Sequence, residues 1–123
     1  MVEAARELGA ERHRFVSLTG GEPLLQPEAA AWLAWELRAL GPAVHLETHG
    51  LHASALERVL PHVDVVSMDW KLGSDVRRAS EAKGSRPAPF GPAHRAFLEC
   101  AVAAPRVVVK VVVTPDSEDA EID

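Results

Sequence analysis

The chain has 123 residues, of which 47% are hydrophobic and 25% are charged, a composition that indicates a folded globular protein and excludes a disordered one. We expect residues 1–123 to form a single domain. The formal net charge of −5 argues against general nucleic-acid binding, which uses a surplus of Lys and Arg against phosphates. One cysteine excludes an internal disulfide, and the charged residues 1–11 predict neither a signal peptide nor a membrane span. The expected location is the cytoplasm.

The predicted elements alternate between helices and strands. Gly and Pro mark the ends of the helices, and apolar runs mark the strands. This alternation is typical of an α/β fold with a parallel sheet and crossover helices. In chain order we expect a helix at 2–8 closed by Gly9, a strand at 13–18, a helix from Pro27 to the Gly41-Pro42 stop, a strand at 43–46, a helix at 54–60, a strand at 63–68, an irregular and partly helical excursion at 73–92, a helix from 92 or 93 to 103, a strand at 106–113 and an acidic tail at 115–123.

Polar residues follow each predicted strand at its C-terminal end. In parallel α/β folds that edge of the sheet binds ligands, whether the sheet is open or closed into a barrel. The pattern therefore predicts one site built from several turns. Its candidate members are Thr19 to Glu22 after the first strand, Glu47 to His49 after the second, Ser67, Asp69 and Lys71 after the third, and Thr114 with Asp116 after the fourth.

The turn after the first strand, Thr19-Gly20-Gly21-Glu22-Pro23, has the composition of a ligand loop. Two glycines allow backbone angles that are closed to other residues, and they let a ligand approach the main chain. Glu22 adds a negative charge, and Pro23 stiffens the exit of the loop. The alternative is an ordinary strand-to-helix turn in which Glu22 is solvated or caps the helix.

The run from Thr19 to Gln26 resembles the Gly-Gly-Glu-Pro motif of radical S-adenosylmethionine enzymes, and especially that of the 7-carboxy-7-deazaguanine synthases. Three later segments agree in order and spacing. Residues 46–50 resemble that family's Glu-Thr-Asn-Gly segment, residues 63–71 its Asp-x-x-Ser-x-Asp-x-Lys strand end, and residues 109–113 its next strand. The resemblance implies the central part of a partial (β/α)6 radical S-adenosylmethionine barrel.

The resemblance also implies contacts for individual residues. Glu22 would lie near the methionine amino group of S-adenosylmethionine, while Ser67 and Lys71 would help to hold its ribose and carboxylate. His49 stands where the family usually carries Asn, and its side chain can still donate a hydrogen bond. The cofactor-binding residues implied are Gly20, Gly21, Glu22, Glu47, Thr48, Ser67 and Lys71.

Thr19 and Gly21 would face the substrate. Intact enzymes of this family use a four-iron four-sulfur cluster, S-adenosylmethionine and magnesium to convert 6-carboxy-5,6,7,8-tetrahydropterin into 7-carboxy-7-deazaguanine, a step of queuosine and 7-deazapurine biosynthesis. The chemistry belongs to the cofactor, and the protein positions it.

Several of these polar residues have a purely structural alternative. Glu47 could form a salt bridge with Lys71, or Asp69 could pair with Lys71. Lys110 is predicted to be a paired or edge residue, and Cys100 to be part of the core.

The cluster ligands are the main departure from the family. Its enzymes bind the cluster through three cysteines at Cys-x-x-x-Cys-x-x-Cys spacing, upstream of the Gly-Gly-Glu-Pro turn, whereas this chain has only Cys100, far downstream. We therefore expect a fragment that begins after the cluster loop and is inactive alone, with no catalytic and no metal-binding residue of its own.

Two other functions fit the same residues. One is a fragment of an activating protein for glycyl-radical enzymes, whose Gly-Gly-Glu-Pro and Asp-x-Lys elements look alike. The other is a non-catalytic remnant that binds S-adenosylmethionine or a partner chain. Open sheet edges favour association, so a homodimer is also expected.

Overall fold

The computed structural model describes residues 1–73, 90–115, 117, 118 and 120. The α-helices and strands alternate as predicted, with short 3-10 helices (η) between them. In chain order the elements are α1 (Val2–Glu7), η1 (Ala10–Arg12), β1 (Phe15–Leu18), η2 (Pro23–Leu25), α2 (Pro27–Ala39), β2 (Ala43–Thr48), α3 (Ala53–Val59), η3 (Leu60–His62), β3 (Val65–Lys71), α4 (Gly91–Ala101) and β4 (Arg106–Val112).

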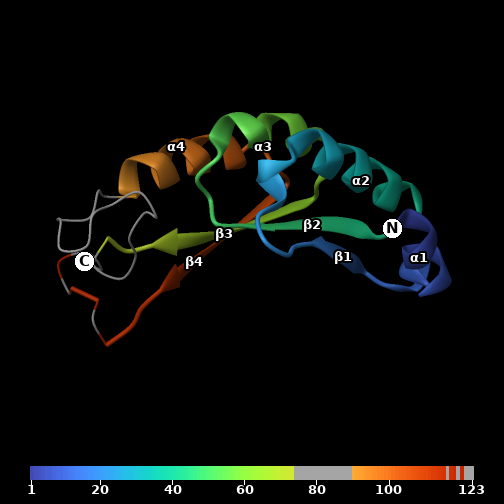
Figure 1. Ribbon diagram of the computed structural model, residues 1–123, viewed down its shortest axis with the longest axis horizontal. Coiled ribbons are helices and arrows are strands. Elements are labelled where there is room, and N and C mark those ends of the chain that lie inside the picture. Colours follow the sequence, from blue (N-terminus) through green and yellow to red (C-terminus); the bar gives the residue numbers. More distant parts are fainter. Residues whose placement is uncertain (74–89, 116, 119, 121–123) are drawn as a thin grey trace.

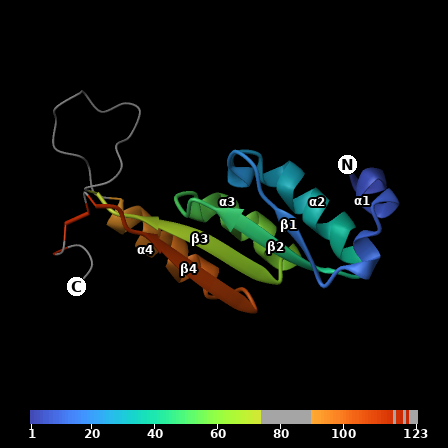
Figure 2. The ribbon, with the colours of Figure 1, turned by 90° about the horizontal axis from the view of Figure 1, so that it is seen from below.

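The four described strands form one parallel sheet in the order β1-β2-β3-β4. The helices α2, α3 and α4 lie side by side over one face of this sheet, and α1 packs beside α2 (Figure 1). The opposite face carries none of the described helices, and Figure 2 views the sheet from that side. The predicted parallel sheet with crossover helices is confirmed. We call the helix-free side the open face.

The core lies between the sheet and the helices. Leu46 on β2, Leu56 on α3, Met68 on β3 and Phe97 on α4 are fully buried there. Alternate residues of β3 point to opposite faces, and yet Val65, Val66, Ser67 and Met68 are all buried. Burial of both faces is typical of a strand inside a parallel sheet, in agreement with the predicted sheet.

Some strands begin or end at other residues than predicted, because pairing with a neighbouring strand sets their length. Strands β2 and β3 continue to Thr48 and Lys71 because those residues pair with Met68 and Val112. Strand β1 begins only at Phe15, since η1 occupies the preceding turn. Most of the predicted excursion (residues 74–89) and part of the tail (116, 119, 121–123) lie outside the described residues. No helix within the described part of the chain is long and apolar enough to span a membrane.

We predict that Gly50 cannot be replaced by alanine without a large loss of stability. Its φ is +69°, and an added Cβ would lie 2.7 Å from the Cε and 3.2 Å from the Cβ of Met68, a fully buried side chain whose Cβ cannot move without the strand. Gly21 has a similar φ of +56° but nothing within 4 Å of the same position. In urea unfolding we expect Gly50→Ala to cost about 2–4 kcal/mol and the control Gly21→Ala about 1–2 kcal/mol. Equal losses would contradict the packing contribution at Gly50.

Candidate functional site at the C-terminal ends of the strands

The Glu22 carboxylate fastens the turn after β1 to the turn after β2. It is only 6% exposed. One oxygen, Oε1, accepts hydrogen bonds from the Leu24 amide at 3.0 Å and the Thr48 hydroxyl at 2.8 Å. The other, Oε2, accepts from the His49 amide at 2.8 Å and lies 3.3 Å from the His49 ring nitrogen Nε2. The carboxylate is thus satisfied inside the protein, as a buried charge requires.

The local sequence explains how Glu22 reaches this position. Gly20 and Gly21 have φ of +93° and +56°, which turns the chain sharply after β1. Glu22 is then the N-cap of η2, and Pro23 occupies the first position of that helix. The predicted alternative, a glutamate that caps the following helix, accounts for the hydrogen bond from the Leu24 amide. A direct contact of Glu22 with the amino group of S-adenosylmethionine stays a prediction.

The outer side of the glycine turn is open. No atom lies within 4 Å of the position that a Cβ would occupy at Gly20 or at Gly21. A ligand can therefore approach the main chain here at a distance that a side chain would prevent. The contact with the methionine end of S-adenosylmethionine that the resemblance implies for this turn stays a prediction.

The turn after β2 is also held from within. The Thr48 hydroxyl, which donates to Glu22, accepts from the Gly50 amide at 3.2 Å. The carbonyl oxygen of His49 lies 3.2 Å from Nε2 of His94, a fully buried side chain on α4. Burial, as the largest cause, lowers the pKa of His94 below its usual 6.5, although its bond to the His49 backbone acts in the opposite direction.

A second polar group lies on the open face and crosses three strands. Asp69 on β3 pairs with Lys71 on the same strand at 2.9 Å and with Lys110 on β4 at 3.3 Å. Lys110 also lies 3.7 Å from Glu47 on β2. Ser67 stands in register with Glu47 and is buried. We call Glu47, Asp69, Lys71 and Lys110 the charge ladder.

The charge ladder stabilises the ionised form of Asp69. Burial acts to raise its pKa, but hydrogen bonds and charge attraction from Lys71 and Lys110 outweigh it and lower the pKa below 3.8. All four side chains are between 29% and 46% exposed, so water still reaches the ladder. Such a strip can exchange its internal partners for the charged groups of a ligand.

The structure thus divides the predicted site residues into two groups. Glu22 and Thr48 meet on the helix-covered side, whereas Glu47, Ser67 and Lys71 lie on the open face. The structural alternative of a salt bridge between Glu47 and Lys71 is wrong: Glu47 lies near Lys110, and Lys71 pairs with Asp69. The predicted pair of Asp69 with Lys71 is confirmed. Asp116 of the fourth turn lies outside the described residues.

Sequence reasoning missed the part played by His94 and underestimated His49. The signal for His94 was its place on the apolar side of α4, where it is buried with Phe97 and Ala101. The contacts of His49 involve its backbone as well as its ring. A residue type does not reveal the contacts of its backbone amide and carbonyl. The presence of His where the family usually carries Asn therefore could not predict these contacts.

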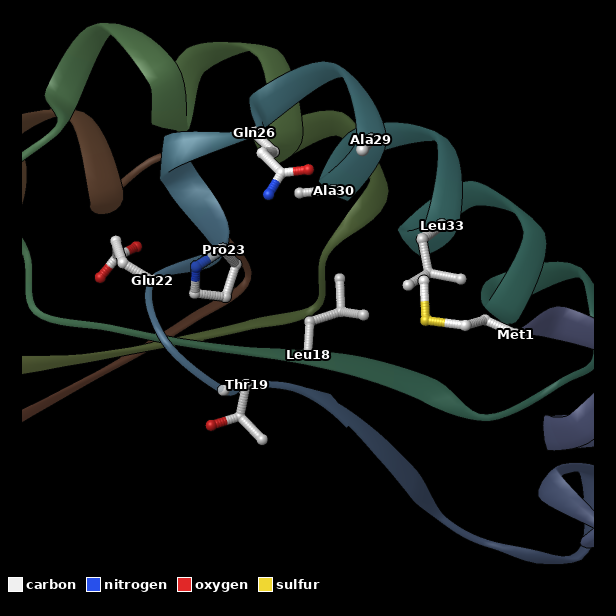
Figure 3. A pocket seen from close by; sticks show the side chains of 10 residues that line it. Met1, Leu18, Thr19, Glu22, Pro23, Gln26, Ala29, Ala30 and Leu33 are labelled. Carbon is white, nitrogen blue, oxygen red and sulfur yellow. The ribbon is translucent and has the colours of Figure 1, made fainter.

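A small hollow of about 210 Å³ lies beside the glycine turn, between β1, η2 and α2. In Figure 3 the side chain of Leu18 points toward α2, those of Leu33 and Met1 lie next to each other across the hollow, and Thr19 points to the other side of β1. The hollow is below the usual volume of small-molecule sites, roughly 300–1,000 Å³. The hollow therefore suits part of a ligand rather than an enclosed small-molecule site.

The single cysteine of the chain does not fit an iron–sulfur cluster, which needs several thiolates. The described residues contain no group of three or more His, Cys, Asp or Glu side chains that could hold a metal ion. The single cysteine, Cys100, packs against the core, and its thiol contacts the carbonyl oxygen of Ala53 at 3.8 Å. Burial, and to a smaller extent the charge of Glu57, raises the pKa of this thiol. Cys100 is therefore a structural residue, as predicted.

Comparison with known proteins yields one informative match. The chain is 38% identical over 110 residues to a 7-carboxy-7-deazaguanine synthase of Geobacter sulfurreducens. That similarity supports a relationship to the synthase. It covers 89% of this chain, but this chain spans only 40% of the length of that relative. No family model matches the chain, and no solved structure matches it.

We predict that the Thr48 hydroxyl stabilises the site. Thr48→Val keeps the shape of the side chain but removes a donor to Glu22 and the acceptor of the Gly50 amide. An unsatisfied buried polar group costs about 1–3 kcal/mol, and we expect a loss of that size in urea unfolding. The control Thr48→Ser keeps the hydroxyl and should lose less than about 1 kcal/mol. A valine variant as stable as the serine variant would contradict the role of the hydroxyl.

We predict a stability loss in mild acid that depends on His94. Its pKa is lower in the folded chain than in the unfolded chain, so below about pH 6.5 the unfolded state takes up a proton that the folded state refuses. Stability from this group is present above that pH and falls as pH decreases, by at most about 1.4 kcal/mol per pH unit.

The measurement is urea unfolding between pH 7.5 and pH 5 for the wild type, His94→Gln and the control His62→Phe. The loss in acid should be smaller in His94→Gln than in the other two. The same pH dependence in all three would show that His94 does not contribute.

Proposed function

We propose that this chain supplies the S-adenosylmethionine-binding part of a radical enzyme of the 7-carboxy-7-deazaguanine synthase type. The 38% identity over 89% of the chain carries this proposal. Support comes from the place of the motifs in the fold. The glycine turn and the charge ladder both lie toward the C-terminal ends of parallel strands, where such folds bind ligands.

The sheet suits a segment of a partial (β/α)6 barrel. In a barrel of this kind the helices form an outer ring and the strands face inward. Here α2, α3 and α4 cover one face and leave the open face free (Figure 1). We infer that the open face is the interior of the proposed barrel, where the pterin substrate and the cofactor would meet.

Each predicted binding residue has a place in this proposal. The main chain at Gly20 and Gly21 would contact the methionine end of the cofactor, with Thr19 and Gly21 on the substrate side. Ser67 and Lys71 would hold its ribose and carboxylate from the open face, close to Glu47. Glu22 and Thr48 would act by holding both turns in place.

The need for an iron–sulfur cluster limits the chemistry that this chain can carry out alone. An iron–sulfur cluster would cleave S-adenosylmethionine when bound, but the residues of this chain do not fit one, because cluster binding needs several thiolates. We therefore propose no radical step within this chain.

The non-catalytic alternative has an observation in its favour, namely the single cysteine. In that case the chain binds S-adenosylmethionine or associates through its sheet edges. Strand β4 is one such edge, and Val109, Val111 and Val112 are between 40% and 52% exposed on it. The activating protein for glycyl-radical enzymes is less well supported, since the relative found is a synthase.

We predict that the chain binds S-adenosylmethionine and that Gly21→Ala weakens binding at least tenfold. The added methyl group would fill the open side of the turn. Gly41→Ala is the matched control, because Gly41 also has a positive φ and open space around it but lies before β2, away from the ligand turns. Calorimetric titration measures both variants. No binding by the wild type, or equal weakening in both variants, would contradict the proposed site.

A second experiment tests the reaction. The coding region upstream of Met1 is read for a Cys-x-x-x-Cys-x-x-Cys segment in frame, and the longer chain is produced and reconstituted anaerobically. We expect 5′-deoxyadenosine and 7-carboxy-7-deazaguanine from 6-carboxy-5,6,7,8-tetrahydropterin with the longer chain, and neither from the 123-residue chain. A chain without such a segment, here or on a partner, would favour the non-catalytic alternative.

A further inference from the structure

We propose that His94 is a positioning residue for the ligand turns: by donating Nε2–H to the carbonyl oxygen of His49, it holds the turn after β2 from the side opposite Glu22. This inference rests on the proposed function, because the turn that His94 holds is one of those proposed to bind S-adenosylmethionine. It adds a residue that the motifs do not include.

The peptide groups of His49 are held on both sides. The amide donates to Oε2 of Glu22 at 2.8 Å, and the carbonyl oxygen lies 3.2 Å from Nε2 of His94. Glu22 belongs to the turn after β1, and His94 belongs to α4, the helix that precedes β4. One residue of the β2 turn therefore connects the turn after β1 with α4, which packs against β3 and α3.

The surroundings of His94 fix the orientation of its ring. The ring centroid lies 5.2 Å from that of Trp70 and 6.0 Å from that of Phe90. The side chain is 0% exposed, so it has little freedom to turn away. It also approaches Gly50, where its Cδ2 lies 3.5 Å from the position of an added Cβ. The ring thus touches the turn that it holds.

The tautomer follows from the partner. A carbonyl oxygen can only accept a hydrogen bond, so Nε2 of His94 must carry the proton. Nδ1 is then an acceptor, and it is buried without a hydrogen-bond partner among the described residues. Burying such a nitrogen costs free energy that phenylalanine would avoid. Histidine therefore has a disadvantage in burial relative to phenylalanine, and what it adds is the hydrogen bond to the carbonyl oxygen of His49.

Two substitutions separate this hydrogen bond from packing. His94→Phe keeps an aromatic ring but removes the donor, and His94→Gln keeps an N–H donor on a side chain of different shape. His62→Phe is the matched control, because it makes the same change in a histidine of η3 that lies outside these contacts. Each of the three substitutions is made separately in the 123-residue chain.

The first measurement is amide hydrogen exchange by NMR at constant pH. In His94→Phe we expect the amides of His49 and Gly50 to exchange at least tenfold faster, relative to the core amides of Leu46 and Val66 in the same variant. His94→Gln should recover most of this protection, and His62→Phe should show no change. The ratio to core amides removes the effect of a general loss of stability.

The second measurement is the dissociation constant of S-adenosylmethionine. We expect it to rise about tenfold in His94→Phe and less than threefold in His94→Gln. Unchanged exchange at His49 in His94→Phe, or equal effects of Phe and Gln, would overturn the positioning role. If the wild type binds no S-adenosylmethionine, the proposed function fails, while the exchange ratios still decide whether His94 holds the turn.

A measurement on the wild type covers the case in which His94→Phe does not fold. The ¹⁵N resonances of the His94 ring distinguish a protonated Nε2 from a protonated Nδ1. We expect a proton on Nε2 and none on Nδ1 near neutral pH. The opposite tautomer would remove the donor to His49 and overturn the proposal.

Discussion

The arrangement of the candidate site depends on one buried carboxylate. Glu22 is almost inaccessible to water, and a charge in that position is tolerated only where its oxygens have partners. The partners come from its own turn and from Thr48 and His49 of the next. The two turns consequently cannot move apart without leaving a charge unpaired inside the protein, and the glycines before Glu22 keep the shape that this contact requires.

The two faces of the sheet differ in how far their polar side chains are buried. On the covered face, apolar side chains of the strands pack under α2, α3 and α4, and the Glu22 contacts close the C-terminal end of that layer. On the open face, the charge ladder stays partly hydrated. A residue that is fully satisfied inside the protein can fix geometry, whereas a hydrated one can change partners. Motif membership alone does not distinguish these tasks, since Glu22 and Glu47 both belong to motifs.

Much of the fold follows from local signals. Pro27 and Gly41 mark the limits of α2, and the apolar run of β3 indicates a strand of a parallel sheet. The ends of β2 and β3 are set by pairing with neighbouring strands, which no local pattern contains. The same applies to the site. The motif residues were recognisable in the sequence, but the contact of His94 joins residues that are 45 positions apart. The Glu47–Lys71 salt bridge, one of the alternatives for Glu47, was wrong, because both Lys71 and Lys110 suited it by charge.

The hydration of the charge ladder has a consequence for the conditions under which the open face binds. Dissolved ions compete for exposed charges, and at physiological ionic strength they screen interactions beyond about 8 Å. Added salt would loosen the hold of Lys110 on Glu47 and Asp69, while the buried contacts of Glu22 would be little affected. The shape of the turns is therefore independent of the ionic medium, whereas the charge that the open face presents to a ligand varies with it.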